Sequence, residues 1–290
     1  MEELTFSDGN VDVVVLPEAG ARIHRLRAFG HDVLRTPADP AEHARDPFFW
    51  GAYVMAPWCN RIEAAEGRED RAARVGSRRI AVPSNFPDGS AIHGLVYARP
   101  WLRGADGRLH VTHDGGGWPW AFTVSLGVAV VDAVVRLDLA LSNTSDEPMP
   151  AGLGIHPWFL RPLLVAIHGD AVHPSNTETR PEPEPVRGAL DLHDIGQMAD
   201  GIDATWADLA DPPVELRWPE ARVGATMRIA APARFVVAAS PGDLDAVAIE
   251  PETHAPHGLR RLLGGEPGGL VMLDPGGELR LGVELAFERL

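Results

Sequence analysis

The fold class is decided by the stretch Val131-Asp132-Ala133-Val134-Val135-Arg136-Leu137-Asp138-Leu139-Ala140-Leu141, in which apolar residues recur at every second position. The C-terminal stretch Leu279–Phe287 repeats this pattern, with Arg280 and Glu284 between its apolar residues. A period of two is typical of a strand with one buried face. In the first stretch, the residues expected to share the buried face are Val131, Ala133, Val135, Leu137, Leu139 and Leu141. We therefore predict two half-buried strands.

Further apolar runs of strand length are separated by turn-forming residues, of which the chain has 30 Gly and 26 Pro. No long amphipathic helix is evident, although Pro40–Arg45 has the pattern of a helical turn capped by Asp39. Many short strands with frequent turns predict an all-β sandwich or barrel, and no strand–helix alternation suggests a doubly wound nucleotide fold. The additional strands that we predict are Val11–Leu16, Phe122–Val128, Val214–Trp218, Thr226–Ile229, Phe235–Ala239 and Ala246–Ile249.

The length of the chain leaves the number of domains open, because 290 residues can form one large all-β domain or two smaller ones. The proline-rich stretch Thr177–Val186 is the candidate boundary, either as a linker or as an extended surface loop. Strand patterns on both sides look like parts of one sheet system. We therefore favour the loop and predict a single domain over residues 1–290.

The charge of the chain limits its partners. The sequence holds 26 basic and 41 acidic residues, for a net charge of −15, and it contains no lysine. An acidic surface repels nucleic acid, and it argues more weakly against phosphorylated sugars. Without lysine there is no P-loop, Schiff-base or kinase-type lysine chemistry. We expect a small-molecule substrate and no nucleic-acid partner.

Cysteine and histidine usage argues against a metal or cofactor. Cys59 is the one cysteine, which fits a reducing compartment and excludes an internal disulfide or a thiolate cluster. The histidines His168, His173, His254 and His257 lack the short ligand spacing of zinc sites, so we interpret them as exposed or pocket-rim residues. The N-terminus does not resemble a signal peptide, and no run approaches the roughly 18 apolar residues of a membrane helix. We expect a cytoplasmic protein, a monomer or homodimer, without cofactor.

Four short motifs supply the candidate chemistry. They contain a guanidinium, two imidazoles and a carboxylate, with aromatic rings beside them, which suits the binding of a sugar and the transfer of its protons. Imidazole titrates near neutral pH, and a planar guanidinium suits neighbouring hydroxyls. The motifs are Asn60-Arg61, His93-Gly94, His156-Pro157-Trp158-Phe159 and Glu250 in Ala248-Ile249-Glu250-Pro251-Glu252-Thr253.

Each of these residues also has an ordinary structural interpretation. An arbitrary glutamate at the end of a strand, as Glu250 is expected to be, is usually solvated. His156 fits an aromatic core, His93 a turn beside a glycine, and Arg61 a surface ion pair. The residue types alone therefore leave structural and functional interpretations open.

The order and wording of the motifs resemble the aldose 1-epimerase (galactose mutarotase) family over nearly the whole chain. Pro57-Trp58-Cys59-Asn60-Arg61-Ile62 is similar to the family's Pro-aromatic-x-Asn-Arg-Ile segment, and Gly154–Phe159 to its Gly-x-His-Pro-aromatic-Phe motif. Glu250-Pro251-x-Thr253 looks like the catalytic-base segment. One departure is His254-Ala255-Pro256-His257, which stands where the family often has Asp-Ala-Phe-Asn.

The resemblance implies a β-supersandwich and an isomerase that interconverts the anomers of an aldose without a cofactor. It implies that Glu250 is the base and His156 the acid, and it ranks Glu252 well below Glu250. Sugar binding is assigned to Asn60, Arg61, His93, Asp203 and Trp158, with Trp58 as a further apolar face.

Two alternatives remain at this point. One is a hexose-6-phosphate 1-epimerase on the same fold, which would use Arg78, Arg79 or Arg99 near the C6 end of the sugar. The other is a sugar-binding or regulatory domain without catalysis.

Overall fold

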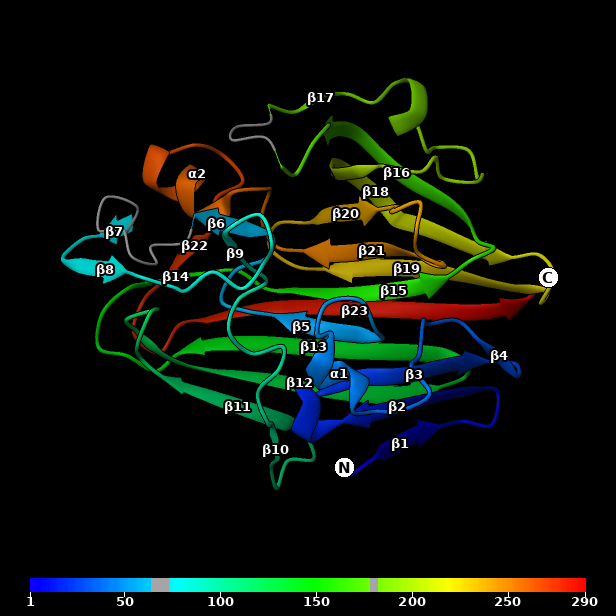
Figure 1. The fold of residues 1–290 in the computed structure, drawn as a ribbon, viewed down its shortest axis with the longest axis horizontal. Helices are drawn as coiled ribbons and strands as arrows, with labels where there is room; N and C mark the ends of the chain where they lie inside the picture. The colour runs from blue at the N-terminus through cyan, green and yellow to red at the C-terminus, as the bar shows by residue number, and fades with distance from the viewer. Residues whose placement is uncertain (64–72, 178–181) are drawn as a thin grey trace.

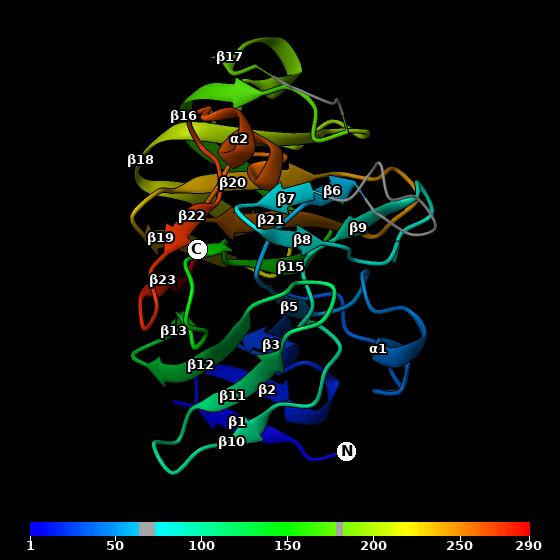
Figure 2. The ribbon, with the colours of Figure 1, turned by 90° about the vertical axis from the view of Figure 1, so that its left-hand side faces the viewer.

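The structure is a computed structural model that describes residues 1–63, 73–177 and 182–290. The described residues form one antiparallel sheet of 17 strands and three two-stranded sheets. The axes of most strands are nearly aligned, with neighbouring strands pointing in opposite directions, and the sheet curls into two layers (Figures 1 and 2). The predicted all-β, mainly antiparallel architecture is confirmed.

The first layer carries the site described below. Its strands pair in the order β1, β2, β3, β5, β15, β21, β20 and β18. Their bounds are β1 (Leu4–Ser7), β2 (Val11–Leu16), β3 (Arg22–Ala28), β5 (Ala52–Met55), β15 (Gly154–Leu160), β21 (Ala246–Glu252), β20 (Phe235–Ala239) and β18 (Asp203–Trp218). The short strand β4 (His31–Asp32) extends β3.

The second layer is joined to the first through β18. The N-terminal part of β18 pairs with β20, and its C-terminal part pairs with β19 (Val223–Ala230). From β19 the layer continues through β23 (Glu278–Arg289), β13 (Val134–Asn143), β12 (Ala121–Val131), β11 (Leu109–Asp114) and β10 (Leu102–Arg103). On its other side β18 pairs with β16 (Leu164–His173), which pairs with β17 (Glu184–Pro185).

Short elements lie around these layers. Three pairs of strands stand apart from the large sheet: β6 (Arg61–Glu63) with β9 (Ser90–Ile92), β7 (Ala73–Val75) with β8 (Arg78–Ile80), and β14 (Met149–Ala151) with β22 (Val271–Leu273). The helices are α1 (Glu42–Arg45), α2 (Gly258–Gly264) and the 3-10 turns Pro17–Ala19 and Gly188–Leu190. Among the described residues, no helix has the length and apolar character needed to cross a membrane.

The core lies between the two layers because alternate residues of each strand turn inward. Val13 and Ile155 of the first layer and Leu137 and Val283 of the second line the same interior space. Burying such side chains contributes about 25 cal/mol per Å² of apolar surface removed from water. The remaining residues of β15 and β21 face away from this core, and they form the floor of the site.

Several predicted bounds need correction. The stretch from Val131 is not one strand, because Asp132 and Ala133 have φ of 54° and 59° and form a hairpin turn between β12 and β13. Val131 is therefore 50% exposed instead of facing the core. The strand predicted as Val214–Trp218 begins at Asp203.

The predicted caps and loops differ in smaller ways. The α1 helix begins at Glu42, and Asp39 accepts a hydrogen bond from the Ala41 amide without being the cap residue. Part of the candidate linker Thr177–Val186 lies outside the described residues. Its C-terminal part forms β17, which pairs with β16 at the edge of the sheet.

Candidate active site

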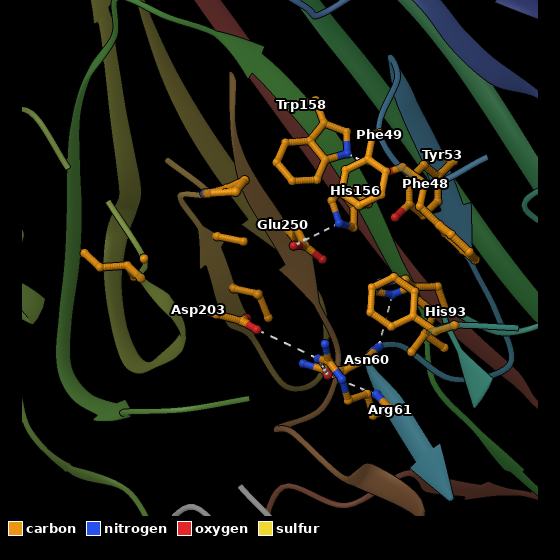
Figure 3. A pocket seen from close by; sticks show the side chains of 17 residues that line it. Phe48, Phe49, Tyr53, Asn60, Arg61, His93, His156, Trp158, Asp203 and Glu250 are labelled. Carbon is orange, nitrogen blue, oxygen red and sulfur yellow. Dashed lines mark hydrogen bonds and ion pairs between the residues drawn. The ribbon is translucent and has the colours of Figure 1, made fainter. Parts of the chain in front are cut away.

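The seven residues predicted for the site, Asn60, Arg61, His93, His156, Trp158, Asp203 and Glu250, line one cavity of about 310 Å³. They come from five segments of the chain that are far apart in sequence (Figure 3). The structure therefore brings together the whole set, and the polar groups face one another across a small volume.

His156 and Glu250 meet on the floor of this cavity. They lie on the neighbouring strands β15 and β21, whose register sets them opposite each other. His156 Nε2 is 3.2 Å from Glu250 Oε1, and both side chains are almost completely buried. The prediction that Glu250 lies at the end of a strand is wrong, because β21 continues through Pro251 to Glu252 and Glu250 lies within it. Rigid strands thus hold both groups in place.

Burial sets the protonation of this pair. It lowers the pKa of His156 well below its usual 6.5, with smaller effects of the neighbouring His93 and Arg22. Burial also raises the pKa of Glu250 well above its usual 4.5, helped by the charges of Glu252 and Asp203. Both shifts disfavour isolated charges. The pair therefore holds a single proton over a wide range of pH, and the short contact lets the two residues share it.

The antiparallel pairing of β6 with β9 brings His93 next to Asn60. Arg61 pairs with Ile92, and the Asn60 amide donates to His93 Nδ1 over 3.3 Å. This bond leaves the imidazole proton on Nε2, and burial lowers the pKa of His93 to about 3. His93 is thus a neutral N–H donor. Gly94 is required here, because a Cβ at this position would lie 1.9 Å from the Ala56 carbonyl oxygen.

Arg61 is bound to two carboxylates at one end of the cavity. Its Nε donates to Asp88 Oδ2 over 2.8 Å, and its Nη1 lies 3.8 Å from Asp203 Oδ2. The other oxygen of Asp203 accepts a hydrogen bond of 2.7 Å from Asn176. Asp88 and Asn176 were not singled out in the sequence. These contacts orient Arg61 and Asp203 and largely balance the guanidinium charge.

An aromatic wall, formed by Phe48, Phe49, Phe86 and Trp158, covers the apolar side of the cavity. Only Trp158 was predicted, although the run Asp46-Pro47-Phe48-Phe49-Trp50 was a visible signal. Trp158 Nε1 donates to the Phe48 carbonyl over 2.6 Å and so ties its strand to this run.

A buried arginine supports this wall from below. Arg22 donates to the carbonyls of Pro47 and Trp50, at 2.9 Å each. Its side chain is fully buried, which lowers its pKa to about 10. The run that carries Phe48 and Phe49 is therefore fixed by backbone contacts at both of its ends.

Trp58 does not contribute to the cavity, which corrects the prediction that it offers a face to the sugar. It is 1% exposed, and its ring stacks on Trp118 in the core, with the ring centroids 5.1 Å apart. The Asn-Arg motif nevertheless depends on its neighbour Pro57, whose carbonyl accepts a hydrogen bond from Gly152.

Beside the cavity, Cys59, Glu252 and His254 bring their polar atoms within 4.8 Å of one another. This cluster was not foreseen, since His254 was interpreted as a rim residue and is 1% exposed. Both His254 nitrogens are in use: Nε2 accepts from the Cys59 amide, and Nδ1 donates to the Ala255 carbonyl. The imidazole therefore has no lone pair left for a metal. Glu252 is completely buried, and burial raises its pKa well above 4.5.

The sequence matches a known protein family, and the fold matches solved structures. Residues 2–285 match the model of the aldose 1-epimerase family. The chain belongs to the aldose 1-epimerase family. Among curated proteins, none matches the sequence.

Solved structures share the fold of this family member. A galactose mutarotase-like protein from Clostridium acetobutylicum is 18% identical, with a TM-score of 0.81 and coverage of 99% of this chain and 95% of that chain. Galactose 1-epimerase from Lactobacillus acidophilus NCFM is 16% identical, with a TM-score of 0.76 and coverage of 99% and 94%. A GalM/aldose epimerase homologue from C. elegans is 13% identical, with a TM-score of 0.79 and coverage of 100% and 99%. The β-supersandwich of the galactose mutarotase type is confirmed.

Proposed function

We propose that this protein, with residues 1–290 as one catalytic unit, interconverts the α and β anomers of an unphosphorylated aldose. The observation that carries the proposal is the buried contact between His156 and Glu250, at 3.2 Å, on the floor of the cavity. An imidazole and a carboxyl group in contact can take up one proton and release another during the same event. Membership of the aldose 1-epimerase family supports this chemistry.

The proposed reaction opens and closes the sugar ring. In the reacting form the shared proton of the pair lies on His156 and Glu250 is the carboxylate. Glu250 takes the proton of the anomeric hydroxyl while His156 gives a proton to the ring oxygen. The bond between C1 and the ring oxygen breaks, and C1 becomes the carbon of an aldehyde. Rotation about the C1–C2 bond presents the other carbonyl face, and closure returns both protons with the two residues in exchanged roles. Every proposed step is a proton transfer or a bond change within the sugar, with no change of overall oxidation state, so the proposed mechanism assigns no role to a cofactor.

The remaining polar residues are proposed to hold the sugar. His93 offers a neutral N–H donor, and Arg61 and Asp203 offer donors and acceptors to hydroxyl groups at the opposite end of the cavity. Asn60 is placed between them, while Trp158 and the aromatic wall face the C–H groups of the ring. Such contacts persist in the ground state and in the transition state, so they contribute mainly to binding.

The charges in the cavity favour an unphosphorylated substrate. Of the described residues that line it, Arg61 alone has a permanent positive charge, and it already contacts Asp88 and Asp203. Arg78, Arg79 and Arg99 do not line this cavity, and Arg78 pairs with Glu147 at 2.7 Å. A phosphate group would therefore meet carboxylates without a free cation. The alternative, a hexose-6-phosphate 1-epimerase, would need a free cation near the sugar, and the described lining of the cavity does not offer one.

Polarimetry tests the proposal directly. The purified protein should accelerate the mutarotation of at least one freshly dissolved α-aldose, in the presence of EDTA as in its absence, and should prefer glucose to glucose 6-phosphate. A higher kcat/KM for the phosphate would refute the substrate class. Sugar binding without any acceleration of mutarotation would refute catalysis and support a sugar-binding domain instead.

A further inference from the structure

Tyr53, His156 and Glu250 form one row across three neighbouring strands. His156 of β15 pairs with Tyr53 of β5 on one side, and the register of β15 and β21 sets it opposite Glu250 on the other. Residues opposite each other on adjacent strands point to the same face of a sheet. The row therefore places a phenol ring directly beside the imidazole, as Figure 3 shows.

His156 lacks the hydrogen bond that commonly orients a histidine in proton transfer. Such a histidine usually bonds a carboxylate or a carbonyl through its second ring nitrogen, and this bond fixes the tautomer and the angle of the ring. Here Nε2 contacts Glu250, and the buried Nδ1 has no hydrogen-bond partner within residues 1–63, 73–177 and 182–290. Among the described residues, the orientation of the His156 imidazole therefore depends on the side chains packed against it and not on a hydrogen bond to Nδ1.

Three rings surround the imidazole, and Tyr53 is the one stacked on it. The centroids of Tyr53 and His156 are 4.6 Å apart, and the ring planes differ by 23°. Trp158 is tilted by 43° at 4.9 Å, and His93 meets His156 edge-on at 5.1 Å. A nearly parallel ring restricts tilting of the imidazole, whereas an edge-on contact leaves that motion open.

Tyr53 is itself held firmly. Its side chain is completely buried, and the Arg22 guanidinium carbon lies 4.7 Å from the centroid of its ring. Arg22 is fixed in turn by its hydrogen bonds to the carbonyls of Pro47 and Trp50. A ring supported in this way can transmit its orientation to a neighbour that packs on it.

We propose that Tyr53 is a positioning residue, whose ring holds the His156 imidazole at the angle at which Nε2 reaches both Glu250 and the sugar ring oxygen. The role belongs to the ring and not to the hydroxyl group, because the contact with His156 is a face-to-face stack. The proposal rests on the proposed function for the step that His156 performs. The orientation of the imidazole can be measured without it.

The test compares Tyr53→Phe, which keeps the ring, with Tyr53→Leu, which removes it but keeps an apolar side chain. Phe122→Leu is the matched control, because Phe122 is likewise completely buried but stands on β12 of the second layer and does not line the cavity. Polarimetry gives kcat and KM, and ¹⁵N NMR of the histidine side chains gives the tautomer and the exchange of His156. Melting curves identify a variant that does not fold, in which case Tyr53→Met replaces Tyr53→Leu.

We expect Tyr53→Phe to keep kcat within about twofold, and Tyr53→Leu to lower it by about 10- to 100-fold with a smaller change in KM, because misplacement of a reacting group by about 1 Å can cost about 10²-fold. The NMR signal of His156 should report one tautomer in the wild type and in Tyr53→Phe, and a mixture in Tyr53→Leu. Phe122→Leu should keep the wild-type kcat and tautomer.

Equal kcat values for Tyr53→Phe and Tyr53→Leu would overturn the positioning role, as would an unchanged tautomer in Tyr53→Leu. A wild-type protein that is inactive on every aldose, but whose His156 tautomer depends on the Tyr53 ring, would overturn the proposed function and leave the positioning role in place.

Discussion

His156 Nε2 and Glu250 Oε1 lie 3.2 Å apart in a contact that solvent hardly reaches. Two groups this close titrate together, so their ionisations are coupled. The predictions about proton transfer therefore concern the number of protons on the pair. The strands β15 and β21 fix the positions of the two groups and therefore the atoms of a bound sugar that they can reach.

Removal of either partner should stop proton transfer. Glu250→Gln keeps the shape of the side chain but cannot take up the proton, and His156→Asn cannot give one to the ring oxygen. We expect kcat to fall by at least about 10²-fold in each variant, because acid–base catalysis contributes about 10²–10⁴-fold. Polarimetry at saturating sugar measures this, and the exposed Glu288→Gln serves as the control. Full activity of Glu250→Gln would show that another residue is the base.

The pH profile of kcat/KM should be bell-shaped, with its limits set by the pair. Burial lowers the pKa of His156, so a second proton is added only well below pH 6.5, and the acid limb should lie there. Burial and the charge of Glu252 raise the pKa of Glu250, so the last proton is lost only well above pH 4.5, and the basic limb should lie on that side. An acid limb above pH 6.5 would contradict this assignment.

Glu252→Gln should stabilise the protein at high pH. Burial raises the pKa of Glu252 in the folded state, so the folded protein keeps a proton that the unfolded chain loses above about pH 4.5. The stability contributed by the neutral form is complete below that pH and is lost as the pH rises through the folded pKa. Glutamine does not ionise, so the melting temperature of the variant should exceed that of the wild type by at least about 2 °C at about pH 9.

The pH dependence of this difference is the diagnostic observation. The gain for Glu252→Gln should shrink as the pH falls below about 4, where the wild-type carboxyl group is neutral in both states. Glu288→Gln, at an exposed position of β23, should show no such trend. A gain that is constant over the whole range would mean that ionisation of Glu252 is not its cause.

Arg61→Ala should impair binding more than chemistry. Arg61 contacts Asp88 and Asp203 at the end of the cavity opposite to the proton-transfer pair, where it is expected to bind hydroxyl groups in both ground and transition states. Loss of one such hydrogen bond to a charged group, at about 1.5–3 kcal/mol, predicts a rise in KM of about 10- to 100-fold. Steady-state kinetics separate KM from kcat, and Arg78→Ala, outside the cavity, should leave both unchanged. A loss confined to kcat would place Arg61 in the chemical step.

Short sequence motifs located the polar residues of the site, because each motif can be recognised within its own stretch of the chain. The pairings between motifs are long-range, since β15 meets β21 and β6 meets β9 only in the folded chain. Asp88 reaches Arg61 from a loop and belongs to none of these motifs. Tyr53 was missed because nothing in its own stretch marks it as a neighbour of His156, which is more than 100 residues away in the sequence.

The predicted strand bounds were wrong where the backbone adopts a conformation that is unusual for the residue types present. Asp132 and Ala133 adopt positive φ in a hairpin turn that usually carries Gly or Asn, so the alternation seemed to continue through them. Pro251 was expected to end a strand, yet β21 continues past it. Trp58 was assigned to the sugar because it belongs to a site motif, but the structure turns its ring towards Trp118.

Three rings of the aromatic wall stand apart in the chain from the proton-transfer pair, and the fourth ring, Trp158, shares β15 with His156. His156 and Glu250 stand on central strands, whereas Phe48, Phe49 and Phe86 stand on connecting segments. A library that varies only these three phenylalanines would therefore sample new sugar shapes while the reacting groups keep their places. If the proposed function holds, redesign for a different aldose should begin at these three phenylalanines, and the floor of the cavity is the part to leave untouched.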